Sequence, residues 1–202
     1  MTLSVLSCGI FRPEIERLMP DIMREIHSEL RVSFVPPALH VDYRKLADGI
    51  AEGFRRMDRR NEEKVLLLYG SMCHPKLPDI AEDAAAAYIK PGNCIDAVLS
   101  KQRKDEIEAK YGRVFYLTAG WLKYWRDIFQ GGMGWDSVDA RTNMGFYDQI
   151  IVLDSGITRI TDEDVIEFFE FTQVPVDVEP ITLDYFKSVL LDICLELKNQ
   201  EG

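Results

Sequence analysis

The 202-residue chain is poor in the features that define disulfide scaffolds, membrane anchors and nucleic-acid surfaces. It has only four cysteines, too few for a disulfide framework in a chain of this length. No segment offers the roughly 18 consecutive apolar residues that a membrane helix needs. Lys and Arg number 24 against 34 Asp and Glu, and the resulting net charge of -10 argues against nucleic acid and anionic membranes as partners, since both attract basic faces.

The signatures of several common enzyme sites are also missing. The sequence contains no GxGxxG, GxxxxGK[ST] or GxSxG, so dinucleotide-binding, P-loop and elbow-hydrolase functions lose their main support. The N-terminal stretch MTLSVLSCGIFRPE has no basic leader before its short apolar run, and a secretory signal is not expected. We therefore expect a soluble, cytoplasmic protein whose cysteines are reduced.

Strand and helix patterns alternate along the chain. Short apolar or β-branched runs predict strands over residues 2–8, 31–40, 64–70, 113–120, 149–156 and 174–181. Helical patterns cover residues 12–30, where Pro20 predicts a kink or a break, and 42–63, 77–88, 94–112, 121–129, 161–171 and 182–200. Repeated strand–helix units predict a three-layer α/β fold, with a mostly parallel, doubly wound sheet and helices on both faces. No linker rich in Pro, Gly or Ser interrupts residues 1–202, so we expect a single domain.

Five of the seven Cys and His residues fall where predicted strands end or predicted helices begin. They are Cys8 after the first strand, His40 after the second, Cys73 and His74 after the third, and Cys94 at a helix start. Ligands of open α/β sheets bind beyond the carboxyl ends of the strands. We therefore expect these side chains to gather at one edge of the sheet. Mid-helix Cys194, in contrast, is expected to be a small buried hydrophobe.

Thiolates and an imidazole at one edge predict metal binding or thiol chemistry. Helix N-termini stabilise thiolates, and three thiolates with one imidazole suit tetrahedral zinc, whereas three cysteines suit an iron–sulfur cluster. The positions 8, 40, 73 and 94 match no compact CxxC or HExxH pattern. Each cysteine taken alone has an ordinary structural explanation, and it is their joint placement that favours a shared site.

An ordered series of short blocks carries a family resemblance. The blocks SCG, PPALH, YGSMCHP, KPGNCIDAVLS and FYLTAGW together resemble the domain-of-unknown-function family 1638, over residues 1–190. Members occur in archaea and bacteria, often encoded beside corrinoid-dependent methyltransferases for methylamines and related compounds. The resemblance implies a cytoplasmic accessory protein of one-carbon metabolism, with corrinoid methyltransferase system proteins as partners and no assigned reaction.

The resemblance also bears on the ligand set. Cys8, His40, Cys73 and Cys94 match the blocks, but the family often places a histidine two residues before the last of these, where this chain has Gly92. His74 is the candidate to supply what Gly92 lacks. The corrinoid-binding DxHxxG pattern is absent, so the chain is not expected to be the corrinoid carrier, and a corrinoid is kept only as a candidate ligand.

A second group of candidates follows the fourth and fifth strands. Thr118 and Trp121 stand after the fourth strand, where an indole could stack on a flat cofactor, and Asp154 ends the fifth strand. Core packing and helix capping explain such residues equally well. The segment YWRDIFQGGMGWD, over residues 124–136, has the glycines and aromatics of a mobile lid or of a surface loop.

Three functions from different classes compete on this evidence. The first is a zinc- or iron–sulfur-binding accessory protein of corrinoid-linked one-carbon metabolism, and the sequence leaves open whether it is an enzyme. The second is a module that binds a small molecule in a pocket lined by Trp121, Trp125 and Trp135. The third is a thiol redox or sulfur-handling protein that uses Cys73 against Cys8 or Cys94.

Overall fold

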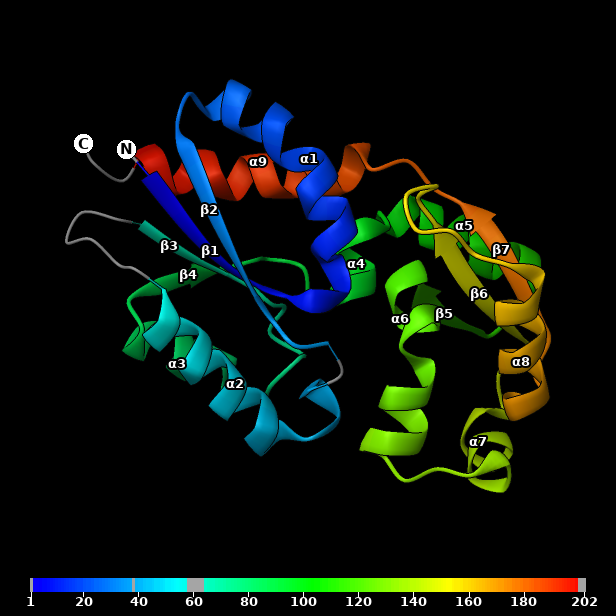
Figure 1. Cartoon of the computed structure of the whole chain (residues 1–202). Helices are drawn as coiled ribbons and strands as arrows, with labels where there is room; N and C mark the ends of the chain where they lie inside the picture. The colour runs from blue at the N-terminus through cyan, green and yellow to red at the C-terminus, as the bar shows by residue number, and fades with distance from the viewer. Residues whose placement is uncertain (1, 38, 58–63, 200–202) are drawn as a thin grey trace. The chain divides into compact units, whose positions relative to one another are not determined.

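The structure is a computed structural model that describes residues 2–37, 39–57 and 64–199, apart from the side chain of His40. The chain forms two compact units, which we call unit 1 (Met1–Val98 with Leu183–Gly202) and unit 2 (Leu99–Thr182). Each unit contains its own parallel sheet flanked by helices, which is the expected α/β architecture (Figure 1). The sequence predicts one sheet in one domain, and the strands instead divide between two sheets because alternation along a chain does not specify which strands pair.

The sheet of unit 1 is four-stranded and parallel throughout. Its strands are β1 (Thr2–Cys8), β2 (Glu29–Val35), β3 (Lys64–Leu68) and β4 (Ala86–Tyr88), in the order β2-β1-β3-β4. The central strands β1 and β3 are buried on both faces, as strands covered on both sides must be, although β1 includes the buried Ser4 and Ser7. The strand order reverses direction between β1 and β3, and this makes the carboxyl ends of these two strands the topological switch point of the unit.

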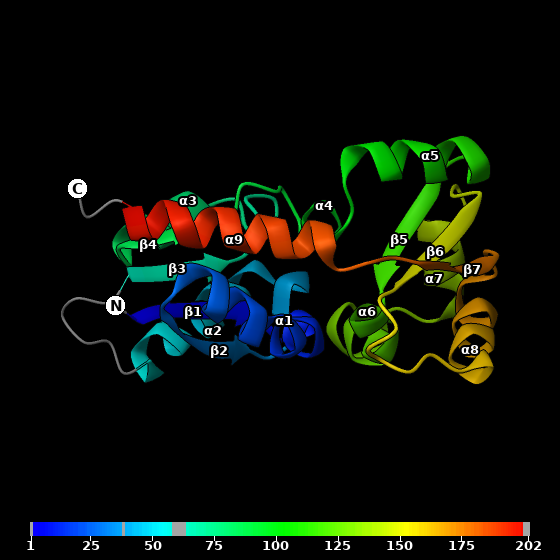
Figure 2. The ribbon, with the colours of Figure 1, turned by 90° about the horizontal axis from the view of Figure 1, so that it is seen from above.

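Helices cover both faces of this sheet, as Figures 1 and 2 show. The helices are α1 (Arg12–Ile26), α2 (Tyr43–Arg56), α3 (Leu77–Asp83), α4 (Cys94–Val98) and α9 (Asp184–Asn199). Leu6 faces α2 and packs against Gly53. A Cβ at Gly53 would lie 2.7 Å from the Leu6 side chain, so this close contact depends on the glycine. Val5, one residue earlier, points to the opposite face, as strand geometry requires.

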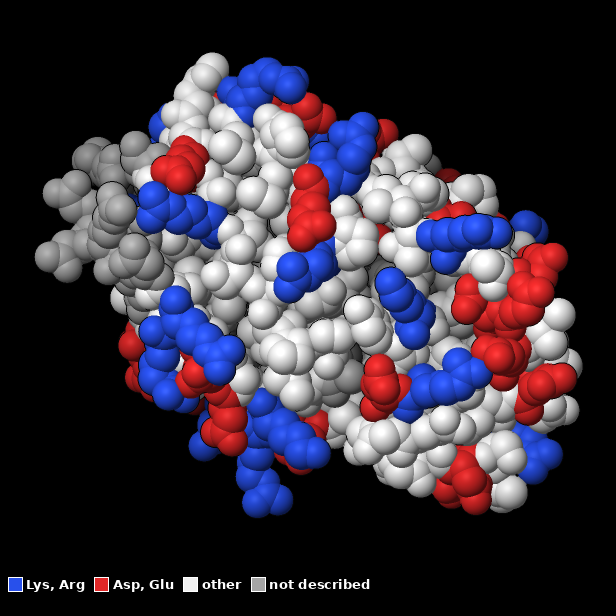
Figure 3. Space-filling view, viewed as in Figure 1, with Lys and Arg blue, Asp and Glu red and all other residues white. Residues whose placement is uncertain are grey.

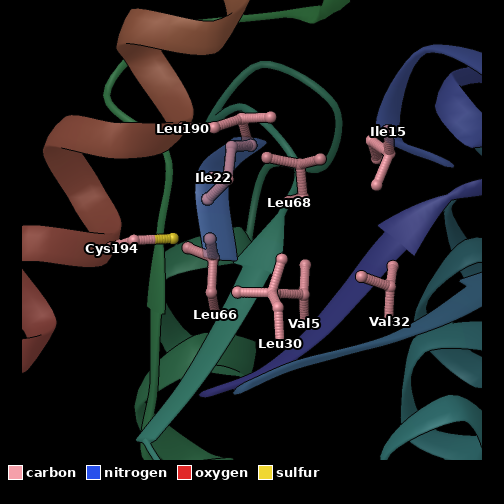
Figure 4. Close-up of a pocket in the computed structure, with 9 residues that line it drawn as sticks. All are labelled: Val5, Ile15, Ile22, Leu30, Val32, Leu66, Leu68, Leu190 and Cys194. Carbon is pink, nitrogen blue, oxygen red and sulfur yellow. The ribbon is translucent and has the colours of Figure 1, made fainter. Parts of the chain in front are cut away.

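A small apolar cavity lies between α1, α9 and the sheet face that bears Val5. Cys194 contributes its sulfur to the lining and is buried, as predicted for a small hydrophobe (Figure 4). The other lining residues come from α1, α9 and the first three strands: Ile15, Ile22, Leu30, Val32, Leu66, Leu68 and Leu190. Burial raises the pKa of the Cys194 thiol to about 12, so this thiol is uncharged at neutral pH.

Unit 2 is built around a three-stranded parallel sheet in the order β5-β6-β7. The strands are β5 (Val114–Thr118), β6 (Gln149–Asp154) and β7 (Val176–Pro180), and the helices are α5 (Lys101–Tyr111), α6 (Ala119–Lys123), α7 (Ser137–Met144) and α8 (Asp162–Thr172). Trp125 packs on Phe168 and Phe171 in its core. Acidic side chains gather on the side of the unit formed by α8 and β7 (Figure 3), where the first turn of α8 alone carries three.

Some predicted elements have different bounds, and capping explains most of the differences. The expected helix over 94–112 is two helices, because Ser100 accepts a hydrogen bond from Arg103 N at 3.3 Å and begins α5. The helix predicted over 77–88 ends at Asp83 and is followed by β4. The unassigned stretch 130–143 contains most of α7, which begins with a capping box between Asp136 and Asp139.

The predictions for two proline positions have different outcomes. Helix α1 continues through Pro20 without a break; Pro20 lies on the exposed face of the helix, where water can satisfy the carbonyl that loses its partner. The strand predicted over 31–40 begins earlier, and its proline pair predicts an edge strand or one that ends early. Strand β2 is both, since it lies at the edge of its sheet and ends at Val35. None of the helices formed by the described residues is long and apolar enough to cross a membrane.

Candidate functional site at the carboxyl edge of the unit 1 sheet

The loops that follow the four strands of unit 1 meet at one edge of its sheet. After β1, an added Cβ at Gly9 would lie 2.7 Å from the Val35 carbonyl oxygen, so the loops after β1 and β2 are in direct contact. After β3, a Cβ at Gly70 would overlap the Gly92 carbonyl, and Met72 N donates to that same oxygen at 2.8 Å. Both close approaches need glycine; the first joins the loops after β1 and β2, and the second joins the Cys73 loop to the loop that precedes Cys94.

His74 fixes the loop after β3 to the start of α2. Its Nδ1 accepts a hydrogen bond from Lys76 N at 3.0 Å, and its Nε2 lies 3.1 Å from the Tyr43 carbonyl oxygen. Because a backbone N–H can only donate and a carbonyl can only accept, the ring must be the neutral tautomer with its proton on Nε2. The imidazole is buried, and it could bind a metal only by releasing one of these two backbone groups.

Cys8 and Tyr69 stand side by side at the switch point. The last registered pair of β1 and β3 joins Ser7 to Leu68; Cys8 and Tyr69 directly follow this pair, and each side chain is near enough to shift the pKa of the other. Both are buried, at 9% and 3% exposure. Cys73 is half-buried in the loop that follows, close enough to both side chains to influence their pKa values electrostatically.

Burial sets the protonation of these three groups. It raises the pKa of the Cys8 thiol to about 11, although the Ile10 backbone N–H and the nearby Tyr69 phenol both favour the thiolate. Burial also raises the pKa of Cys73, with the Gly70 backbone acting in the opposite direction. The pKa of Tyr69 lies well above its usual range, because of burial and then because of the adjacent Cys8. All three groups are therefore neutral at pH 7 in the free protein.

The Tyr69 hydroxyl is a buried polar group left unsatisfied. Within residues 2–37, 39–57 and 64–199, its Oη has no hydrogen-bond partner of normal geometry. An unsatisfied buried hydroxyl costs about 1–3 kcal/mol, and proteins seldom retain one without a reason. The sequence analysis missed Tyr69, although a tyrosine that ends a fully apolar strand directly before the glycine of YGSMCHP is a readable signal.

Cys94 and the predicted histidine ligands fit the shared site less directly. Cys94 is half-buried at the first position of α4, but it is Asn93 that caps this helix, accepting from Ile95 N at 2.9 Å and Asp96 N at 3.0 Å. His40 belongs to a 3-10 turn over Leu39–Val41, and its side chain lies outside what the structure describes. Among the side chains that are described, no three from His, Cys, Asp and Glu lie close enough together to hold a metal ion.

Glu14 is a further buried polar residue that the sequence analysis missed. It lies in the first turn of α1, shortly after Cys8, and is 6% exposed. Its spacing of four residues from buried Leu18 places it on the inner face of the helix. A carboxylate in the buried stripe of an amphipathic helix is the signal that could have identified it.

The candidates in unit 2 have structural partners. Thr118 caps α6 by accepting a hydrogen bond from Trp121 N at 3.3 Å, and Asp154 accepts one from Gly156 N at 2.7 Å. Trp121 is half-buried, with its ring 6.1 Å from that of Phe129. The predicted lid is in large part a π-helix over Arg126–Gly132 that buries Phe129 at 2% exposure. Capping and packing thus account for these residues, and a cofactor role for Thr118, Trp121 and Asp154 stays a prediction.

Comparisons with known proteins identify a family and little more. A family model described as "Protein of unknown function (DUF1638)" matches residues 34–190, so the first block of the resemblance, at Cys8, lies outside the match. No curated protein matches the sequence. A lac repressor structure with ONPG in the repressed state aligns at a TM-score of 0.46 and 10% identity, covering 100% of this chain and 76% of that one. A lac repressor dimer bound to operator and the anti-inducer ONPF aligns at 0.41 and 9%, covering 100% and 77%. Likeness at this level identifies no function.

Proposed function

Because the chain belongs to the DUF1638 family, whose members are proteins of unknown function, we propose an activity from its own residues. Unit 1 binds a thiophilic metal ion at the carboxyl edge of its sheet. Cys8 and Cys73 supply thiolate ligands. The observation that carries this proposal is the convergence of two buried or half-buried thiols and an unsatisfied phenol at the switch point of the sheet, where open α/β sheets bind their ligands.

The donor set fits a soft metal in part. Thiolates favour zinc, copper(I) and iron–sulfur clusters over hard cations, and the carboxyl edge is rigid because Gly70 and His74 fix the Cys73 loop on two sides. Such rigidity holds ligands in place before a metal arrives. Two thiolates do not complete a zinc or iron–sulfur site, and the remaining ligands would come from His40 or Cys94, which flank the same edge.

The chemistry that a metal would supply depends on displacing protons. Cys8 and Cys73 are protonated in the free protein because burial raises both pKa values, and a coordinating thiol is deprotonated. Metal binding would then release protons and become weaker as the pH falls. The same burial argues against these cysteines as free nucleophiles at neutral pH, where little thiolate exists.

A dithiol function is the second candidate. It is favoured by the absence of a third His, Cys, Asp or Glu ligand beside the pair among the described side chains. In that case Cys8 and Cys73 would cycle between dithiol and disulfide with an external thiol–disulfide partner, and the buried thiols would react slowly until the Cys73 loop opened.

The biological setting rests on the family resemblance alone. We extend the proposal to an accessory role in corrinoid-linked one-carbon metabolism, in which the metal-loaded protein interacts with a corrinoid or with proteins that carry one. Equilibrium dialysis of metal-loaded protein against a corrinoid tests this extension separately. If wild type retains no corrinoid, the protein does not bind the corrinoid directly.

The central experiment is anaerobic purification, zinc loading and metal analysis of wild type and three serine variants. We expect stoichiometric metal in wild type and in Cys194→Ser, the matched control on the other face of the sheet, and a large loss in Cys8→Ser and Cys73→Ser. A brown visible spectrum would identify an iron–sulfur cluster.

Two results would overturn the metal proposal. Wild-type metal content in both Cys8→Ser and Cys73→Ser would show that the switch-point thiols are structural. A metal-free wild type with a titratable dithiol would favour the second candidate, and a metal-free wild type with inert thiols would favour the small-molecule module.

A further inference from the structure

The outer face of α8 carries an apolar pair, although this face is turned to solvent. Ile166 and Phe169 are 52% and 40% exposed, whereas Phe168 and Phe171 on the inner side of the same helix are 0% and 6% exposed. Residues three apart are neighbours on a helix surface, and the solvent face of a surface helix is normally polar or charged. The packing of unit 2 therefore accounts for the inner side of α8 and leaves the outer pair unexplained.

Acidic side chains surround this pair. Asp162 and Glu163 precede Ile166 by about one turn, Glu170 directly follows Phe169, and all three are exposed. Residues 160–182 contain seven Asp and Glu and no Lys or Arg, so this short stretch carries most of the net charge of -10. Figure 3 shows acidic side chains gathered on this side of unit 2.

The stability of the helix does not account for all of these charges. Acidic residues in the first turn favour a helix, but Glu170 lies in the last turn, where the helix dipole disfavours negative charge. Glu163 and Glu167 are four residues apart, a spacing at which like charges repel. Arg126 forms an ion pair with Glu167 at 2.6 Å, but α8 itself has no Lys or Arg. An apolar pair within an acidic surround is thus kept at a cost to the helix.

The charge of this face selects among the molecules that could cover it. Nucleic acids and anionic membranes are repelled by it. A second copy related by a two-fold axis would place the same patch on both sides of the interface, acidic against acidic. A partner with Lys and Arg around an apolar stripe matches both the charge and the apolar pair. Helix α8 has 11 residues and is about 16 Å long, which suits a small, transient contact.

We propose that the outer face of α8 docks a basic amphipathic helix of a partner protein. Apolar side chains of the partner pack on Ile166 and Phe169, as in the packing of two helices by their side-chain ridges. Its Lys and Arg side chains pair with Asp162, Glu163 and Glu170, which makes the association faster at low salt. This surface belongs to unit 2 and does not depend on the metal binding proposed for unit 1.

A synthetic peptide tests the proposal by fluorescence anisotropy. The probe is a fluorescein-labelled helical peptide of leucine and lysine, with leucines at i, i+3, i+4 and i+7. We expect wild type to bind it, and more weakly as salt screens the charges. The double variant Ile166→Ser/Phe169→Ser should bind about 10-fold more weakly. Glu163→Gln/Glu170→Gln should also bind more weakly, and its binding should depend less on salt.

Matched variants on other helices control for nonspecific attraction to an acidic protein. Leu195 of α9 is 39% exposed, and Glu82 and Asp83 are exposed acidic neighbours on α3. Leu195→Ser and Glu82→Gln/Asp83→Asn should bind the peptide as wild type does. Tryptophan fluorescence verifies that each α8 variant is folded, because Trp125 packs on Phe168 and Phe171.

Three results would overturn the proposal. The first is a wild type that does not bind the peptide. The second is equal binding by wild type and the folded Ile166→Ser/Phe169→Ser variant, which would place the peptide elsewhere. The third is a wild-type dimer in analytical ultracentrifugation that Phe169→Ser dissociates, because a second copy of the chain would then cover this face. None of these results bears on the metal content of unit 1.

Discussion

Units 1 and 2 are both parallel α/β layers, yet the polar groups at the carboxyl ends of their strands have different fates. In unit 2 the groups are satisfied locally, since Thr118 caps α6 and Asp154 accepts from the Gly156 backbone. In unit 1 Cys8 and Tyr69 are buried at the corresponding edge, and the phenol has no hydrogen-bond partner among the described residues. A polar residue at the end of a strand is therefore a candidate functional residue, and the stronger candidates are those whose hydrogen-bonding groups have no partner within the fold.

The two units also carry separate spectroscopic reporters. All four cysteines lie in unit 1, at positions 8, 73, 94 and 194, and all three tryptophans lie in unit 2, at positions 121, 125 and 135. Thiol labelling during unfolding therefore follows unit 1, and tryptophan fluorescence follows unit 2. The predictions below use this division.

The largest expected effect is an alkaline loss of stability that is larger in unit 1 than in unit 2. Burial raises the pKa of Cys8 from 9.0 to about 11 and that of Cys194 from 9.0 to about 12. A thiol whose folded pKa is raised stabilises the fold fully below its unfolded pKa, and this contribution is lost as the pH rises through the folded value. At about 1.4 kcal/mol per pKa unit, full titration is linked to about 3 kcal/mol for Cys8 and about 4 kcal/mol for Cys194. Urea unfolding of metal-free protein at pH 8 and pH 10.5 should show unit 1 weakening more than unit 2.

The matched variant is Cys194→Ala, which lacks one of the three thiols of unit 1 whose pKa values burial raises. It should lose stability at pH 8 through the larger cavity, and its stability should then depend less on pH than that of wild type. If the protection of the unit 1 thiols from labelling falls equally between pH 8 and pH 10.5 in wild type and in Cys194→Ala, Cys194 is not a source of the alkaline loss of stability.

The next effect concerns the close contact between the loops after β3 and β4. In Gly70→Ala the new methyl group would overlap the Gly92 backbone, which cannot move aside as a flexible side chain would. We expect unit 1 to lose about 3 kcal/mol in urea unfolding followed by thiol labelling, with little change in tryptophan fluorescence. Gly131→Ala in unit 2 is the control, since its added methyl would meet only the Arg126 carbonyl oxygen, at 3.8 Å. Similar effects of the two substitutions would show that the loop contact is not tight.

The smallest effect is an acidic one in unit 2. Hydrogen bonds from the Arg113 side chain and backbone lower the pKa of Asp148 from 3.8 to about 2. A carboxylate whose folded pKa is depressed stabilises the fold above its unfolded pKa, and this is lost as the pH falls through the folded value. Asp148→Asn should therefore be slightly less stable than wild type at pH 6 by tryptophan fluorescence, and the difference should close by pH 2. A difference that persists unchanged at pH 2 would rule out the ion pair as its source.

Local pattern was sufficient to predict most elements of the fold. The apolar run of KVLLLYG specifies a central strand, and the spacing of Ile15, Leu18 and Ile22 specifies the buried face of α1. The division into two sheets was not predictable in the same way, because pairing depends on contacts between distant residues. The short strand β4 was missed since alanines favour helix, and it forms through its pairing with β3.

The candidate site follows from the sequence in the strand ends that form it, and less so in the residues proposed for it. Strand ends gave Cys8 and Cys73, whose positions follow from topology. His74 was proposed as a ligand because of its place in the sequence, but only the structure reveals that both ring nitrogens hold backbone groups. Tyr69 and Glu14 each carry a local signal, at the end of an apolar strand and in the buried stripe of a helix, but the burial of their polar atoms is a property of the folded chain.

The division of unit 1 into two chain segments has a consequence for the order in which the protein is made. Residues Leu99–Thr182, which form unit 2, emerge as one uninterrupted piece, whereas unit 1 lacks α9 until after that piece has been synthesised. Helix α9 supplies Leu190 and Cys194 to the lining of the inner cavity, and Lys198 donates to the Ile26 carbonyl at 2.7 Å. Until α9 docks, one apolar face of the unit 1 sheet is incompletely covered, so unit 1 is the first to begin its synthesis and the last to complete its core.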